Sequence, residues 1–144
     1  MENASQSGNT KVTVETTIGA DVKKVWEYLT KPEHITKWNF ASDDWHCPRA
    51  ENDLRVGGKM NSRMEAKDGS FGFDFEVTYD EIVEGKKIVY TIADGRKVTT
   101  TFTNEAGGTR VATVFEAETE NPIEMQKGGW QAILDNFRKY VEAN

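Results

Sequence analysis

The sequence predicts an α+β fold in which a curved antiparallel β-sheet wraps around a long C-terminal helix, with two short helices after the first strand. Three observations predict it. Apolar and polar residues alternate along short segments between residues 11 and 117. Turns rich in glycine separate the later segments, and no βαβ alternation appears, so hairpins are favoured over a parallel sheet. The chain then ends in one amphipathic stretch, the only element long enough to cover the apolar face of the sheet.

The first elements follow from periodicity. A strand is predicted over residues 11–18, where Val12, Val14 and Ile18 share one face. Asp21 is placed to cap a helix that begins at Val22. Thr30 is expected to open a second short helix that has Pro32 in its first turn and ends around Trp38.

The next region predicts a loop and then a hairpin. Residues 39–53 are rich in turn-forming residues and show few periodic apolar positions. Gly57 and Gly58 suggest a bulge or bend within a strand. Met60 and Met64 share one face of the strand that follows, and "KDGS" (67–70) predicts a hairpin turn.

A row of aromatic residues is the strongest strand pattern in the chain. One face carries Phe71, Phe73, Phe75, Val77 and Tyr79, while Gly72, Asp74, Glu76 and Thr78 lie on the other. Further strands are predicted around residues 88–92, 98–102 and 111–117. The segments therefore form a meander of antiparallel hairpins.

The C-terminal helix is predicted from Asn121 and Pro122, as cap and first-turn proline, to the end of the chain. Gly128 and Gly129 fall inside it, where each costs about 1 kcal/mol relative to alanine. A close approach of the helix backbone to the sheet, or a local kink, would account for them.

Composition excludes several functions. The net charge is −6 and no long run of Lys or Arg is present, so nucleic-acid binding is not expected. No apolar stretch approaches the roughly 20 residues that span a bilayer, and the polar start lacks the pattern of a signal peptide. One cysteine cannot form an internal disulfide. We therefore predict a cytoplasmic protein without membrane insertion, with residues 1–10 as a flexible tail and 11–144 as a single domain.

Four stretches, taken in order, resemble one protein family. They are "ADVKKVWEYLTKPEHITKW" (20–38), "NDLRVGGKM" (52–60), "YDEIVEGKKIVYT" (79–91) and "GGWQAILDNFRKYV" (128–141). This combination is similar to the helix-grip superfamily of START and birch-pollen-allergen-like domains (SRPBCC). It resembles more closely the homologues of the activator of Hsp90 ATPase, the AHSA-like family. Relatives often continue the Trp38 position with a second Trp and a Gly-Pro, whereas this chain reads Asn39-Phe40-Ala41.

The resemblance implies a hydrophobic cavity between the sheet and the C-terminal helix. Its superfamily includes lipid carriers, hormone receptors, polyketide cyclases and co-chaperone domains, so it does not fix one activity. The residues expected to line the cavity are Trp38, Met60, Met64, Phe73, Phe75, Tyr90, Phe102, Trp130, Leu134 and Phe137. Phe40 and Trp45 are expected at its rim.

The stretch "ASDDWHCPRA" (41–50) gathers several metal-ligating letters, among them Asp43, Asp44, His46 and Cys47. These residues are nearly consecutive and lack the spacing of a metal site, and a catalytic Cys–His pair is usually distant in the chain. We therefore predict a loop with Trp45 anchored and Cys47 buried or unreactive. No metal, cofactor or catalytic residue is expected.

The main hypothesis is a non-enzymatic module that binds a small apolar, aromatic, amphipathic or lipid-like ligand. Arg55, Arg63 or Arg96 could orient an anionic group of that ligand. One alternative is a cyclase- or hydrolase-type enzyme that uses a cavity carboxylate, from Asp74 or Glu76, or a tyrosine. Another is a protein-interaction module that contacts a chaperone or a second copy of the chain.

Overall fold

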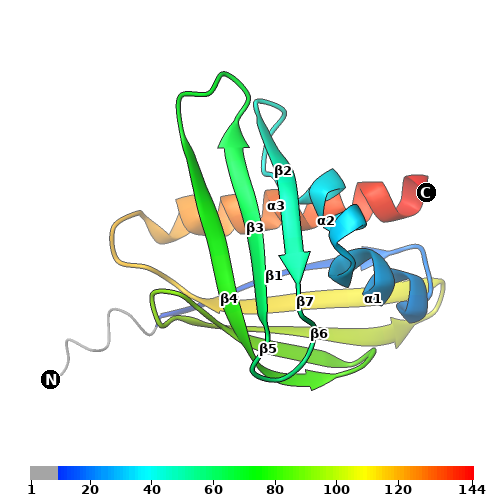
Figure 1. Ribbon diagram of the computed structural model, residues 1–144. Helices are drawn as coiled ribbons and strands as arrows, with labels where there is room; N and C mark the ends of the chain where they lie inside the picture. Colours follow the sequence, from blue (N-terminus) through cyan, green and yellow to red (C-terminus); the bar gives the residue numbers. More distant parts are fainter. Residues whose placement is uncertain (1–9) are drawn as a thin grey trace, which may run out of the picture.

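The computed structural model describes residues 10–144 and shows a curled antiparallel sheet with a long helix lying along its concave side (Figure 1). The elements are β1 (Lys11–Ile18), α1 (Val22–Thr30), α2 (Pro32–Trp38), β2 (Trp45–Asn52), β3 (Lys59–Ala66), β4 (Gly72–Val83), β5 (Lys87–Ile92), β6 (Lys97–Glu105), β7 (Gly108–Glu116) and α3 (Ile123–Ala143). The predicted α+β helix-grip architecture is confirmed.

The seven strands run in the order β1-β7-β6-β5-β4-β3-β2, and every neighbouring pair is antiparallel. Strands β2 to β7 therefore form the predicted meander, and its last strand, β7, pairs with the first strand of the chain, β1. The two helices α1 and α2 carry the chain from one edge strand to the other. The sheet curls but stays open as a half-barrel, because its edge strands β1 and β2 do not pair with each other.

The helix boundaries differ slightly from those expected. Asp21 caps α1 as predicted, since its Oδ1 accepts from the Lys24 amide at 2.9 Å. Thr30 does not open α2; it ends α1 and its hydroxyl donates to the Trp26 carbonyl at 2.8 Å. Pro122, rather than Asn121, is the N-cap residue of α3.

The glycine pair in α3 has no close neighbour. A Cβ atom built on Gly128 or Gly129 meets no other atom within 4 Å, outside the helix's own local backbone. The helix runs from Ile123 to Ala143 without interruption. The expected close approach of the helix to the sheet is therefore absent at these two residues, and it does not explain them.

Two other expectations are corrected. Residues 45–52 were expected to be loop, yet they form β2, an edge strand whose register shifts between His46 and Arg49. Pro48 lies at this irregularity, and an edge strand tolerates proline because one side of its backbone has no partner strand. Gly57 and Gly58 lie in the β2–β3 connection rather than within a strand, and Gly57 needs its positive φ of 85° there.

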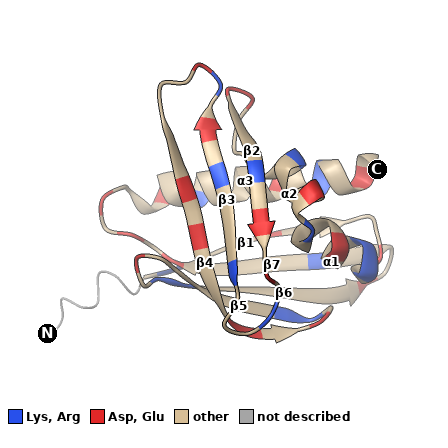
Figure 2. Ribbon diagram, in the orientation of Figure 1, with Lys and Arg blue, Asp and Glu red and all other residues tan. Residues whose placement is uncertain are grey.

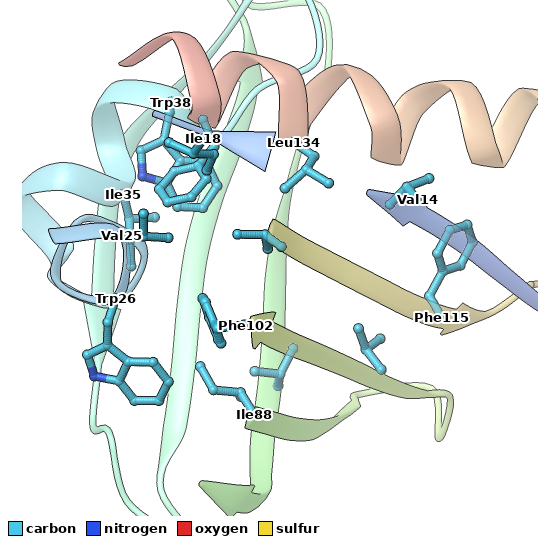
Figure 3. Packing of buried hydrophobic residues seen from close by; sticks show 14 of the residues in the cluster. Val14, Ile18, Val25, Trp26, Ile35, Trp38, Ile88, Phe102, Phe115 and Leu134 are labelled. Atoms are coloured by element: carbon cyan, nitrogen blue, oxygen red, sulfur yellow. The ribbon is translucent and has the colours of Figure 1, made fainter. Parts of the chain in front are cut away.

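The apolar core fills the end of the concave face beneath α1 and α2 (Figure 3). Trp26 of α1 packs edge-on against Phe102 of β6, with ring centroids 5.3 Å apart. Trp38 of α2 packs in the same way against Phe137 of α3, at 4.8 Å. The packed core therefore joins all three helices to the sheet at this end.

Only Thr10 of the predicted tail, residues 1–10, falls within the described residues. Across residues 10–144, none of the helices has the length and apolar character needed to cross a membrane.

Candidate functional site

A cavity of about 350 Å³ lies between α3 and the concave face of the sheet. This volume is within the range of small-molecule sites, roughly 300–1,000 Å³. Every strand except β2 contributes side chains to its wall. The turn between β5 and β6, the C-terminal ends of α1 and α2, and the middle of α3 contribute the rest. Its lining residues are Val14, Leu29, Thr30, Trp38, Asn39, Met60, Met64, Phe73, Phe75, Tyr79, Ile88, Tyr90, Arg96, Thr100, Val111, Thr113, Trp130, Ile133 and Leu134.

Strand periodicity places the side chains of β3 and β4 in this cavity. Met64 lies opposite Phe73 in the β3–β4 register, so these residues share the concave face. Met60 lies opposite Val77, and Phe75 follows two residues after Phe73. The wall opposite the sheet belongs to α3, whose residues Trp130, Ile133 and Leu134 recur at helical spacing and line the cavity.

Eight of the ten residues expected around the cavity do line it: Trp38, Met60, Met64, Phe73, Phe75, Tyr90, Trp130 and Leu134. The other two, Phe102 and Phe137, are 6% and 0% exposed and belong to the packed core. These two rings do not reach the cavity because Trp26 packs against Phe102 and Trp38 packs against Phe137. Figure 3 shows Trp26 facing Phe102 and Leu134 pointing from α3 towards the sheet.

Several lining residues were not singled out from the sequence. Ile133 follows Trp130 by three positions, a signal that helical spacing contained. Tyr79 belongs to the aromatic row and could have been chosen with Phe75. The threonines Thr100 and Thr113 carried no signal as cavity residues, and their hydroxyls hydrogen-bond each other at 2.9 Å across β6 and β7.

A groove of about 390 Å³ adjoins the cavity, and we refer to this groove as the mouth. The cavity and the groove share the residues Met64, Phe73, Trp130 and Ile133. Trp45, expected at the rim, lines this groove and contacts Phe73 and Phe71, with ring centroids 6.1 and 6.0 Å away. Phe40, the other expected rim residue, is among the lining residues of neither space.

The metal-like residues of "ASDDWHCPRA" do not converge. His46 points to Glu65, with Nε2 and Oε1 3.6 Å apart, whereas Cys47 is 3% exposed. Burial raises the pKa of the Cys47 thiol to about 11. Between residues 10 and 144, no three His, Cys, Asp or Glu side chains lie together as metal ligands would.

The carboxylates of β4 lie on the outer face of the sheet. Asp74 pairs with Arg63 at 3.6 Å and Glu76 pairs with Lys59 at 3.5 Å. Figure 2 shows acidic positions along β4 and basic positions along the neighbouring strand β3. None of the described residues that line the cavity is Asp, Glu, His or Cys.

Two tyrosines bring hydroxyl groups to the cavity. The Tyr79 hydroxyl donates to Asn52 Oδ1 at 2.7 Å, and Asn52 Nδ2 donates to the Thr30 carbonyl at 2.6 Å. Burial raises the pKa of Tyr79 to about 12. Burial also raises the pKa of Tyr90 far above its ordinary value, with a further rise from Tyr79 and a smaller opposing effect from Arg96. Both phenols are therefore protonated at neutral pH.

Comparison with known proteins agrees with this fold. A family model described as "Activator of Hsp90 ATPase homolog 1-like protein" matches residues 19–142. The solution structure of an AHSA1-like protein from Aeromonas hydrophila is 42% identical, with a TM-score of 0.88 and 93% of each chain covered. A protein of known solution structure from Cytophaga hutchinsonii is 48% identical, with a TM-score of 0.80 and the same coverage.

More distant structures share the fold alone. A protein from Chromobacterium violaceum is 24% identical, with a TM-score of 0.84 over 94% of this chain and 99% of that chain. A search of curated proteins found no match.

Proposed function

This chain belongs to the Activator of Hsp90 ATPase homolog 1-like family, and from that premise we propose that it is a single binding domain for a small apolar or aromatic ligand. The observation that carries the proposal is the cavity of about 350 Å³ between α3 and the sheet. Aromatic and methionine side chains form much of its wall, and these surfaces favour apolar ligands. We also propose that the domain acts in the cytoplasm, where a lone buried thiol such as Cys47 is ordinary.

The binding energy would come from apolar burial, at about 25 cal/mol per Å² of ligand surface removed from water. The mouth supports entry from one side, since Phe73 and Trp130 line both the groove and the cavity. Met60 and Met64 suit this role because methionine side chains adapt to ligands of different shape.

The enzymatic alternative has less support. Among residues 10–144 its carboxylate version has no residue to carry it, because Asp74 and Glu76 form ion pairs on the outer face. Its tyrosine version would need a phenol that loses its proton readily. The raised pKa values of Tyr79 and Tyr90 oppose that at neutral pH.

Titration with the neutral fluorescent dye N-phenyl-1-naphthylamine tests the proposal. We expect saturable binding of one dye per chain, with fluorescence enhancement and a matching complex in native mass spectrometry. Ile133→Trp adds bulk between the cavity and its mouth and should weaken binding. Lys139→Trp places the same side chain at an exposed position of the same helix and should leave binding unchanged.

The proposal fails if the folded protein shows no saturable dye binding. It also fails if Ile133→Trp and Lys139→Trp bind the dye as the unmodified protein does.

A second candidate function, a protein contact at the mouth, is favoured by one observation. Phe71 and Met125 are 62% and 63% exposed, and Trp45 lies in contact with Phe71. Exposed apolar side chains that gather in this way are typical of interaction surfaces. Sedimentation velocity over a wide concentration range tests self-association, and Phe71→Ser with Met125→Ser should abolish any dimer found.

A further inference from the structure

Two hydrogen-bond donors, Tyr90 and Arg96, face the cavity from one hairpin. Tyr90 of β5 lies opposite Val98 of β6, so both point to the same face of the sheet. Arg96 is two residues before Val98 and is therefore the diagonal neighbour of Tyr90 on that face, a spacing that long side chains can bridge. Both residues line the cavity.

The Tyr90 hydroxyl differs from the other hydroxyls of the cavity. Tyr79 donates to Asn52, and Thr100 and Thr113 bond each other. Within residues 10–144, the hydroxyl of Tyr90 bonds no other side chain, and it is not among the fully buried polar atoms that lack a partner, so it is open to the cavity that Tyr90 lines. A ligand in the cavity would cover this donor, and a ligand acceptor that bonds it avoids the cost of leaving a covered polar group unpaired.

Arg96 supplies the cationic group. It forms an ion pair with Asp94 at 2.8 Å, and it differs from Arg55 and Arg63 because it lines the cavity. Its Nε donates to Asp94 Oδ2 at 2.8 Å and its Nη1 donates to the Glu116 carbonyl at 3.1 Å, so the guanidinium is held in place. Its Nη2 has no hydrogen-bond partner among the described residues. The side chain is only 20% exposed. Arg96 is also the one charged residue among the described residues that line the cavity.

The other two arginines considered for this role lie elsewhere. Arg55 pairs with Asp53 at 2.9 Å and its side chain is 72% exposed. Arg63 pairs with Glu65 at 2.8 Å on the outer face of β3. Among residues 10–144, the cavity therefore has one basic residue, Arg96. Aromatic rings lie on the same wall, where the ring centroids of Tyr90 and Phe75 are 6.4 Å apart.

We propose that Tyr90 and Arg96 form an oxyanion subsite, so that the physiological ligand is an amphipathic acid with an apolar or aromatic body and one carboxylate or similar group. The phenol hydroxyl and the free edge of the guanidinium both donate to the anion, which makes charge-assisted hydrogen bonds. The body of the ligand lies along Phe75, Met60 and Trp130. This inference rests on the proposed binding function and adds the chemical class of the ligand.

Two dyes with one aromatic frame test the subsite. N-phenyl-1-naphthylamine is neutral, whereas 8-anilino-1-naphthalenesulfonate carries a sulfonate on the same frame. We expect the sulfonated dye to bind about tenfold more tightly, the effect of about one charge-assisted hydrogen bond. Tyr90→Phe and Arg96→Gln should each bring the ratio of the two affinities to within about twofold of one, because the sulfonate loses a donor that the neutral dye does not use.

Tyr79→Phe is the matched control, because it removes a hydroxyl that the protein already uses. It should lower stability without changing the ratio of the two affinities. Urea denaturation of every variant, with far-UV circular dichroism, establishes that each is folded under the titration conditions.

The outcomes separate the two proposals. Equal binding of both dyes, or an affinity ratio that Tyr90→Phe and Arg96→Gln leave unchanged, overturns the oxyanion subsite and leaves the cavity proposal standing. Failure of the folded protein to bind either dye overturns both.

Discussion

Replacing Gly128 and Gly129 by alanine is expected to stabilise the protein. Both residues lie inside α3, and a Cβ atom at either position meets no other atom within 4 Å. The substitution therefore adds helix propensity without a steric cost, worth about 1 kcal/mol at each position. For a chain of this size, 1 kcal/mol corresponds to roughly 4 °C in Tm.

The assay is urea denaturation monitored by tryptophan fluorescence. Gly128→Ala, Gly129→Ala and the double variant are compared with one shared m value, the slope of the unfolding free energy against urea concentration. The double variant should gain about 2 kcal/mol if the two effects add. Ala132→Gly in the same helix is the reverse control and should lose about 1 kcal/mol. A loss of stability in either glycine variant would refute the reasoning, since it would require a close contact at that glycine.

Gly129 also lines the groove at the mouth. If the glycines are kept because the first part of α3 must bend to admit a ligand, the stabilised variants will bind the neutral dye more slowly. Stopped-flow fluorescence separates this rate effect from a change in affinity.

Three further substitutions test the core and its polar groups. Ser62→Ala should raise stability by about 1 kcal/mol, because the Ser62 hydroxyl is buried without a partner among the described residues; a loss of 1 kcal/mol in urea denaturation would contradict this. Tyr79→Phe should cost about 1–2 kcal/mol because it leaves Asn52 Oδ1 unpaired, and a neutral result in the same assay would show that this bond is unimportant. Burial raises the pKa of Cys47 from 9.0 to about 11. The contribution of this buried neutral thiol to the free energy of unfolding is therefore complete below pH 9 and is lost as the pH rises towards 11. By pH 10 the protein should have lost about 1 kcal/mol that Cys47→Ala does not lose, and parallel stability–pH curves for the two proteins would refute this.

Residue pattern was sufficient for most of the fold. The alternation in β4 and the spacing in α3 identify both walls of the cavity, because each wall depends on local periodicity alone. The β2 strand was missed because it is an edge strand with Pro48, and its polar residues resemble a loop. An edge strand needs fewer apolar residues than a central one, so periodicity is weak there.

The division of the concave face between core and cavity could not be read from the sequence. Phe102 and Tyr90 both lie on inward-facing positions, yet Trp26 covers the first and the cavity lies before the second. That outcome depends on where α1 packs, which is a long-range contact. Arg96 was likewise undecided, because it lies in a turn and only the hairpin register shows which face it shares.

Methionine methyl NMR tests the central claim most directly. The chain has four methionines, and three of them mark different depths: Met60 in the cavity, Met64 between cavity and mouth, and Met125 at the mouth and 63% exposed. On titration with N-phenyl-1-naphthylamine, the account predicts that the Met60 and Met64 methyl resonances shift most and show intermolecular NOEs to the dye. Shifts and NOEs confined to Met125 would place the dye on the surface and contradict the account.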